Sequence, residues 1–371
     1  MILKNLIKHI ETWAPPGIAW EKDNVGLQIG STQSQITNII LCLEVNSRVV
    51  DDAIKKRCNL IISHHPLIFN PLKSITDRDS QSELIQKIIK NEINVFSAHT
   101  NLDFTKDGVS FQLAKKLKLQ QIRFLTNLSS NQYKIVVFVP EKFVEKVASA
   151  MHNAGAGQIG DYSNCSFRIE GRGTFKGNNS TNPFIGIKGI LEYVKEIRLE
   201  MIANSFDLPK ILTAMKESHP YEEVAYDLYK LYNENVNFGI GAIGVLNQSM
   251  TKEEFLLYVS KSLKINNFRY TSGNKNKIKT VAVCGGSGSD LANEAIKQNA
   301  DAFITADVKY HKFQEVQNKI LLIDAGHYET EIFILNELEK RINKFLEKEK
   351  IKVYKYKGST NPVIFYNKSG E

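Results

Sequence analysis

The 371-residue sequence has few cysteines and no long apolar run, and these two shortages exclude several classes of protein. Its four cysteines stand far apart and form no C-x-x-C pair: Cys42, Cys58, Cys165 and Cys284. This spacing argues against a disulfide framework and favours reduced thiols. No apolar stretch is long enough to cross a bilayer, and the amphipathic N-terminus lacks the small-residue cleavage site of a signal peptide. We therefore expect a cytoplasmic protein without a membrane partner.

Positive charge is in excess, with a formal net charge of +8 at pH 7. Lysines gather in three runs, at residues 115–118, 275–279 and 348–357. The first two runs lack interleaved aromatic residues, and isolated charge runs usually form a solvated surface. Nucleic acid is therefore only weakly supported as a partner.

The order of expected strands and helices indicates an α/β fold. Before residue 124 we expect strands at 39–43, 60–62 and 93–98, and helices at 1–14, 48–57, 81–91 and 109–119. After residue 238 we expect strands at 279–284, 302–305, 320–323 and 352–356, and helices at 251–263, 290–298, 309–317 and 330–347. Such alternation is typical of a parallel sheet covered by helices. Residues 1–124 and 238–371 should form one discontinuous α/β domain with a mainly parallel sheet.

The intervening residues 125–237 have a different order of elements. Strands are expected at 134–139, 163–169, 197–203 and 224–231, with helices at 141–153 and 207–217. This β-α-β-β-α-β order predicts an inserted α+β domain with a ferredoxin-like fold. None of the histidine and acid clusters described below falls inside it.

Three of the expected strands run directly into histidines. His64 and His65 follow the strand at 60–62, His99 follows the strand at 93–98, and His327 follows the strand at 320–323. Ligands of open α/β sheets gather at the carboxyl ends of the strands. The sequence therefore predicts one cleft that carries several imidazoles.

The chemistry of this cluster favours a pair of metal ions. Adjacent side chains on a strand point to opposite faces, and Pro66 keeps His65 extended, so the rings of His64 and His65 should splay apart toward two metals. Asp103 and Glu331 are the natural bridging acids. The set of His64, His65, Asp103, His327 and Glu331 leaves positions open for water, as catalytic metal sites do. The alternative is that these histidines cap strands or satisfy buried hydrogen bonds.

Four further residues are weaker candidates for the same cleft: Asn24, His99, Asp307 and His311. His99 could orient a ligand or contact substrate. Asp307 begins a helix after a strand and could serve only as its N-cap.

Two glycine-rich segments match phosphate-binding patterns only superficially. Residues 239–244 fit G-x-G-x-x-G, but a strand end and a turn follow them where a dinucleotide-binding helix should begin. Residues 285–290 lie between a strand and a helix, where their N–H groups could hold an anion. A plain turn between strand and helix is the better explanation of the second segment, because glycine and serine favour turns without any ligand.

Five segments together resemble the Nif-three-like family, also called GTP cyclohydrolase I type 2 homologues or dinuclear metal centre hexameric proteins. They are D-N-V-G-L-Q at 23–28, I-I-S-H-H-P-L at 61–67, H-T-N-L-D at 99–103, T-A-D-V-K-Y-H at 305–311 and D-A-G-H-Y-E-T-E at 324–331. The resemblance implies two divalent metal ions per subunit on His64, His65, Asp103, His327 and Glu331. It also implies a toroidal homohexamer and, in longer members, an inserted PII-like domain.

The expected function is that of a metal-dependent hydrolase. Two cations would generate hydroxide from water near neutral pH, and no side chain of the sequence is assigned as the catalytic group. The family name implies GTP as substrate, whereas the broader expectation is a nucleotide or another phosphate-containing small molecule. Imidazole and carboxylate ligands suit Zn, Fe, Mn, Co or Ni. The alternative is a hexameric metal-binding scaffold or regulatory protein that binds nucleic acid or a small-molecule signal without turnover.

Overall fold

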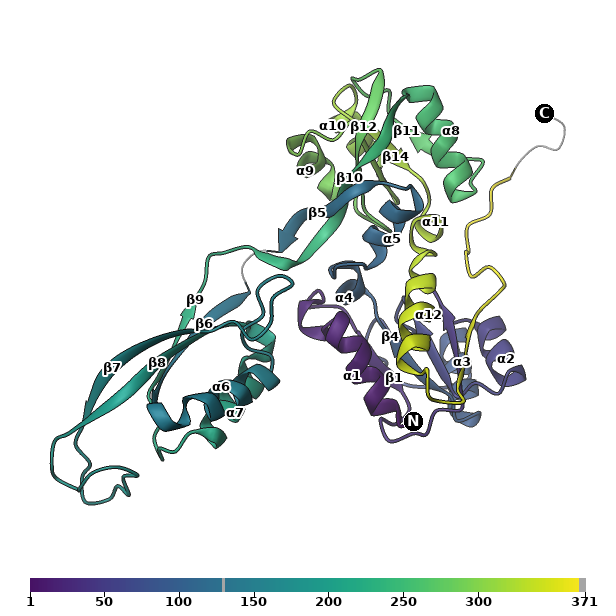
Figure 1. The fold of residues 1–371 in the computed structure, drawn as a ribbon. Coiled ribbons are helices and arrows are strands. Elements are labelled where there is room, and N and C mark those ends of the chain that lie inside the picture. Colours follow the sequence, from purple (N-terminus) through teal and green to yellow (C-terminus); the bar gives the residue numbers. More distant parts are fainter. Residues whose placement is uncertain (129–130, 367–371) are drawn as a thin grey trace. The chain divides into compact units, whose positions relative to one another are not determined.

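The computed structural model describes residues 1–128 and 131–366 (Figure 1). It divides the chain into two compact units, residues 1–126 with 238–371, and residues 127–237. None of the helices in the described part of the chain combines the length and the apolar character that a membrane crossing requires.

The first unit contains a five-stranded sheet with the order β1-β4-β3-β2-β15. Its strands are β1 (Gly26–Ile29), β2 (Asn38–Cys42), β3 (Leu60–Ser63), β4 (Asn94–Ser97) and β15 (Lys352–Lys355). The four strands β15, β2, β3 and β4 are parallel, and only the edge strand β1 runs antiparallel to its neighbour. Every residue of β3 and β4 is buried, as expected of parallel strands covered on both faces.

Helices cover both faces of this sheet. The helices α1 (Leu3–Trp13) and α12 (Ile334–Phe345) pack on the face that carries Ile39 and Leu41 of β2. The helices α2 (Ser47–Lys55) and α3 (Ser80–Lys90) pack on the face that carries Ile40 and Cys42. This alternation follows from the period of two along a strand.

A second sheet in the same unit has the order β11-β14-β13-β12-β10-β5. Its strands are β5 (Gln120–Leu128), β10 (Asn235–Thr251), β11 (Arg269–Tyr270), β12 (Lys277–Val283), β13 (Ala302–Thr305) and β14 (Leu321–Asp324). The strands β12, β13 and β14 are parallel, whereas β10 and β11 run antiparallel to their neighbours. Its helices are α5 (Val109–Lys116), α8 (Lys252–Leu263), α9 (Ala292–Lys297) and α10 (Tyr310–Val316).

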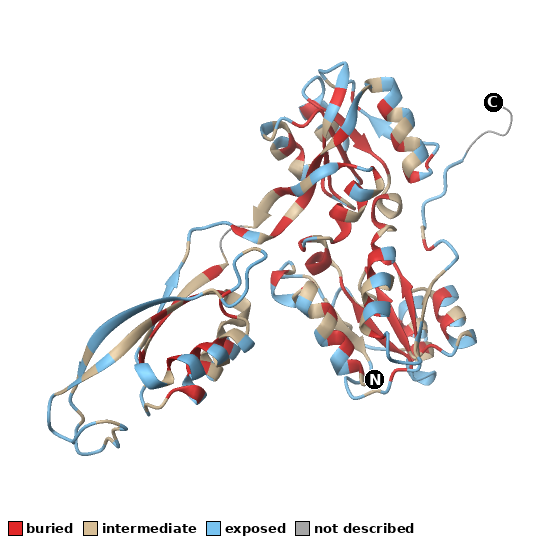
Figure 2. Cartoon of the chain, viewed as in Figure 1, coloured by how far each residue is buried: buried red, intermediate tan, exposed pale blue. Residues whose placement is uncertain are grey.

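The expectation of a single sheet in the discontinuous domain is therefore wrong. Alternating strands and helices indicate which neighbouring segments pair, but they do not say whether distant segments join the same sheet. The chain forms the first sheet, then the second, and returns to the first with β15. Figure 2 shows buried residues along the strands of both sheets.

Several short elements, three of them strands of these sheets, were not expected from the sequence. The strands β1, β5 and β11 and the one-turn helix α4 (Thr100–Asp103) were not expected. The helix expected at 330–347 is instead two helices, α11 (His327–Glu331) and α12. The helix α8 begins with a capping box, in which Thr251 and Glu254 bond reciprocally. Four 3-10 helices occupy Pro16–Ile18, Glu141–Phe143, Ser205–Asp207 and Ser289–Leu291 of the described chain.

The second unit is an antiparallel sheet with helices on one face. Its elements are β6 (Gln132–Pro140), α6 (Val144–Asn153), β7 (Phe167–Phe175), β8 (Glu192–Asn204), α7 (Leu208–Ser218) and β9 (Tyr226–Lys230). The strand order is β7-β8-β6-β9. Alternate residues of β6 and β8, among them Ile135, Val137 and Leu199, form the core with α6 and α7 (Figure 1). The expected strand at 163–169 lies four residues later, at Phe167–Phe175.

Candidate metal centre

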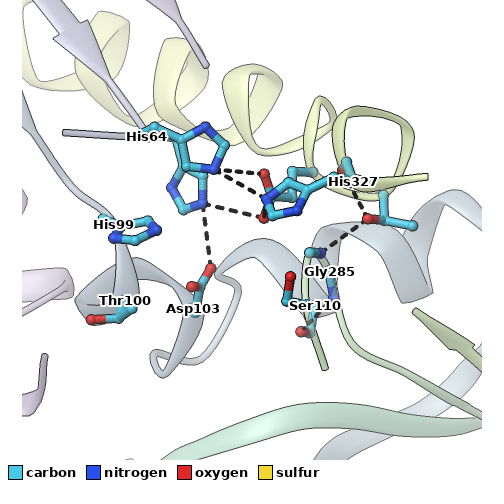
Figure 3. A network of polar contacts seen from close by, with 12 residues as sticks. His64, His99, Thr100, Asp103, Ser110, Gly285 and His327 are labelled. Carbon is cyan, nitrogen blue, oxygen red and sulfur yellow. Dashed lines mark hydrogen bonds and ion pairs between the residues drawn. The ribbon is translucent and has the colours of Figure 1, made fainter. Parts of the chain in front are cut away.

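Four histidines meet where strands of the two sheets of the first unit end. His64 and His65 follow β3, and His99 follows β4, so these three come from the first sheet. His327 begins α11, which follows β14 of the second sheet. Figure 3 shows His64, His99 and His327 pointing toward one another, with Asp103 beside them. The carboxyl ends of parallel strands from the two sheets thus supply one cluster.

The five predicted ligands lie within a few ångströms of one another. Glu331 places Oε2 3.1 Å from Nε2 of His65 and Oε1 3.1 Å from Nε2 of His327. The Nε2 atoms of His65 and His327 are 3.3 Å apart. On the other side, Nε2 of His64 lies 3.5 Å from Oδ1 of Asp103 and 3.8 Å from Oε1 of Glu331. Two sets of three side chains have a spacing suited to an ion: His64, His65 and His99, and His65, His327 and Glu331.

Every histidine of the cluster has its Nδ1 atom held by an oxygen. Nδ1 of His64 donates to the carbonyl oxygen of Ala98 at 2.8 Å. The other three Nδ1 atoms lie beside carboxylates: His65 beside Glu44 at 3.0 Å, His99 beside Asp23 at 2.9 Å and His327 beside Asp307 at 2.6 Å. When Nδ1 carries the proton, the lone pair of Nε2 is free to bind a cation.

Three buried polar atoms in the cluster have no hydrogen-bond partner. They are Nε2 of His64, Oδ1 of Asp103 and Oε2 of Glu331. His64 is fully buried and Glu331 is 3% exposed. A buried polar atom without a partner costs roughly 1–3 kcal/mol, so three of them in one place call for a missing partner. A cation would satisfy all three, because each atom can offer a lone pair.

The electrostatics of the cluster without an ion place protons where a cation would sit. Burial lowers the pKa of His65, but the carboxylates of Glu331 and Glu44 beside its two ring nitrogens outweigh burial and raise it to about 10. Burial also lowers the pKa of His327, and the bonds to Glu331 and Asp307 raise it to about 9. The carboxylates therefore attract positive charge strongly enough to hold protons on two imidazoles at neutral pH.

The two buried carboxyl groups respond in opposite directions. Burial, followed by the neighbouring Glu331 carboxylate, raises the pKa of Asp103 well above its usual range. Burial also raises the pKa of Glu331, but the imidazoles of His64 and His327 more than offset that effect and lower it. The surrounding imidazoles thus favour the ionised form of Glu331, whereas burial and the neighbouring carboxylate favour the neutral form of Asp103.

Comparison with known proteins identifies the family. The profile of the Duf34/NIF3 (NGG1p interacting factor 3) family matches residues 1–362. The chain belongs to the Duf34/NIF3 family. The resemblance drawn from the five sequence segments is thereby confirmed.

Curated relatives and solved structures of this family are similar over almost the whole length. Proteins of Halalkalibacterium halodurans and Bacillus subtilis, each named "GTP cyclohydrolase 1 type 2 homolog", are 39% and 37% identical. The alignments cover 94% and 98% of this chain, and 94% and 98% of those proteins. A crystal structure of a Bacillus cereus protein related to NIF3 is 36% identical, with a TM-score of 0.84 over 99% of each chain.

The weaker candidates of the sequence analysis have different positions in this Duf34/NIF3 member. His99 joins the cluster, with its ring centroid 5.3 Å from that of His64 and 5.4 Å from that of His65. Asp307 holds His327 and also accepts a hydrogen bond from the Ser287 hydroxyl. The side-chain amide of Asn24 donates to the carbonyl oxygen of Ile68 at 2.5 Å, in the loop before Phe69.

His311 does not join this network. It is exposed on α10, where its ring contacts Tyr310 and Gln314. It was a candidate for the cleft because it follows a strand end, but it is the second residue of α10 and its side chain is exposed.

Two functional residues were missed by the sequence reasoning: Glu44 and Asp23. Glu44 follows β2, so the strand-end rule that selected His64 and His99 could have found it. Asp23 belongs to the first segment of the family resemblance, but it precedes an edge strand and carries no such signal. It binds His99 and also accepts from the backbone N–H of Thr100 at 3.0 Å.

The glycine-rich segment at 285–290 makes room for Glu331, and two of its N–H groups bond to hydroxyl groups of the protein instead of facing an anion. Gly286 donates its N–H to the Thr330 hydroxyl at 3.0 Å, and Gly288 donates to the Thr305 hydroxyl at 2.9 Å. Gly286 has a φ of +64°, and a Cβ atom there would lie 2.2 Å from Oε1 of Glu331. Glycine at this position therefore makes room for the central carboxylate.

Proposed function

We propose that this chain is a metal-dependent hydrolase that holds two divalent ions on His64, His65, Asp103, His327 and Glu331. The observation that carries the proposal is the convergence of the three unpartnered buried atoms of His64, Asp103 and Glu331. Bound divalent cations supply Lewis acidity, which lowers the pKa of water and stabilises negative charge on a substrate oxygen. Zn, Fe, Mn, Co and Ni all suit this mixture of imidazole and carboxylate.

The side chains around the ions would orient them and exclude water. The oxygen partners of Nδ1 would fix the imidazoles of His64, His65 and His327 so that Nε2 faces the ions. Burial of His64 and Glu331 keeps water away from one side of the site. His99 is held by Asp23 and lies beside the exposed ring of Phe69, where it can bind substrate.

A nucleotide is the substrate class that we favour. The names of the curated relatives point to GTP, and an aromatic side chain beside the cluster supports a planar ring. Phe69 is 48% exposed, and its ring centroid lies 6.4 Å from that of His99. Its loop is held in place because Ile68 bonds to the side chains of Asn24 and Gln28. An exposed ring on a fixed loop is suited to stack on a nucleobase.

Two finer parts of the family resemblance also enter the proposal. The β-α-β-β-α-β order of residues 132–230 supports a ferredoxin-like fold of the PII-like kind for the inserted unit. Assembly into a homohexamer is testable by light scattering coupled to size-exclusion chromatography.

The decisive experiment reconstitutes the protein with each of the five metals and measures hydrolysis. We expect GTP, or another nucleotide, to be consumed with release of formate or phosphate, and we expect His64→Ala to abolish this release. His311→Ala is the matched control, since it removes an exposed imidazole outside the network. Absence of turnover with every metal and nucleotide, although metal binds in stoichiometric amounts, would contradict the proposal.

A further inference from the structure

The segment that follows β15 is exposed along most of its length but is buried at one residue. Residues 357–359 and 362–366 are exposed, whereas Thr360 is only 8% exposed. Fixing an extended segment of this kind costs about 1–2 kcal/mol per residue, so specific contacts must hold it. Those contacts are made by Ser359, Thr360 and Asn361.

Thr360 is linked to a predicted metal ligand through one carboxylate. Its hydroxyl donates to Oε2 of Glu44. The other oxygen of Glu44, Oε1, lies 3.0 Å from Nδ1 of His65. With one oxygen bound to Thr360, the Glu44 carboxylate has a defined orientation toward the imidazole. Thr360 thereby acts on the orientation of His65, although it does not touch the cluster.

The neighbours of Thr360 bind the helix that carries two more ligands. Asn361 donates from its side-chain amide to Oε1 of Glu329 at 2.8 Å, and Ser359 and Tyr328 line the same pocket. Tyr328 and Glu329 lie on α11, between His327 and Glu331. α11 has only five residues, and a helix this short needs contacts from outside to keep its position.

We propose that residues 359–361 form a latch that positions the metal ligands. Thr360 fixes His65 through Glu44, and Ser359 and Asn361 fix α11, which presents His327 and Glu331. These are positioning residues, because none of them contacts the cluster itself. The inference rests on the proposed metal site and names a part of the chain that controls its affinity.

The first test compares Thr360→Val with Thr360→Ser in the full-length chain. Valine keeps the shape of threonine but removes the hydroxyl, whereas serine keeps the hydroxyl. We expect Thr360→Val to weaken Co²⁺ binding by about tenfold, the lower end of the effect of losing an outer partner of a ligand, because Thr360 acts on His65 through Glu44, and we expect Thr360→Ser to restore binding. Val363→Ala, in an exposed residue of the same segment, is the control and should bind as the wild type does.

Co²⁺ affinity is measured by competition with a chelator, and the visible absorption of bound Co²⁺ reports the ligand geometry. A merely structural role would lower the melting temperature of the metal-free protein and leave both readouts unchanged. A second pair of variants ends the chain at Asn361 or at Gly358, so that both lose the exposed end but only the shorter one loses the latch. We expect normal binding in the longer variant alone.

The outcomes separate the two proposals. Wild-type affinity and spectrum in Thr360→Val and in the chain ending at Gly358 would overturn the latch and leave the metal site intact. Failure of the wild type itself to bind any divalent metal would overturn the metal site, and the latch with it.

Discussion

The substitution Gly286→Ala tests the geometry of the cluster most directly. Gly286 adopts a φ of +64°, in the left-handed region, where a Cβ atom costs about 1–2 kcal/mol. The loop cannot easily relax, because the backbone of Gly286 donates to Thr330 and accepts from Ala306 and Thr305. The added methyl group must therefore displace the side chain that it meets.

That side chain is the central carboxylate. The new Cβ atom would lie 2.2 Å from Oε1 of Glu331, whereas ordinary contact begins at 3.4 Å, so the oxygen must move by about 1.2 Å. A metal site tolerates errors in ligand distance of only about 0.2 Å. We expect the affinity for Zn²⁺ or Co²⁺ to fall by at least about tenfold, with a loss of folding stability of about 1–2 kcal/mol.

The assay pairs chelator competition with thermal unfolding of the metal-free protein. Gly160→Ala is the matched control, since Gly160 has a φ of +55° and no atom within 4 Å of the added Cβ. Gly160→Ala should lower the folding stability by the cost of a left-handed backbone, without any loss of metal affinity. If Gly286→Ala binds metal as tightly as the wild type does, Glu331 does not hold the ion and our account of the cluster is wrong.

Three further predictions concern charge, orientation and substrate. Metal binding should release at least about two protons at pH 7.5, because His65 and His327 have pKa values raised to about 10 and about 9 and the ion replaces their protons. The metal affinity should therefore rise with pH. Calorimetry in buffers of different ionisation enthalpy measures the number of protons released, and a value near zero would refute the assignment of these two ligands. Asp23→Asn should reduce activity more than metal content, because Asp23 holds His99 and Thr100 and forms no hydrogen bond with the five proposed ligands. Equal losses measured by elemental analysis and turnover would contradict this role. Phe69→Ala should raise KM for a nucleotide by about tenfold with little change in kcat, because the ring no longer stacks on the base. Phe69→Tyr keeps an aromatic ring and should restore the wild-type KM. An unchanged KM in Phe69→Ala would exclude stacking.

Part of the fold was predictable because its causes are local. Apolar runs bounded by turns predicted β2, β3, β4, β13 and β14 to within about two residues. Short edge strands such as β1 and β11 have no such signal, since their residues are half-buried or exposed and pair only because a neighbour is present.

The candidate site shows the same division at the level of single residues. The histidines at the ends of β3, β4 and β14 could be picked out because the carboxyl ends of parallel strands collect ligands. The contact between Glu44 and Thr360 could not be predicted in this way, because the two residues lie 316 positions apart and no local pattern marks Thr360.

By itself, then, the sequence predicted the type of most long elements, although not of β10, and it singled out five side chains as proposed metal ligands, because periodicity and residue type act over a few positions. Only the tertiary structure decided that two sheets, and not one, present those side chains. It also decided which oxygen holds each imidazole and which atoms are left without a partner. The physical reason is that hydrogen-bond pairing and burial depend on which distant segments meet, and that information does not lie in any short stretch of the chain.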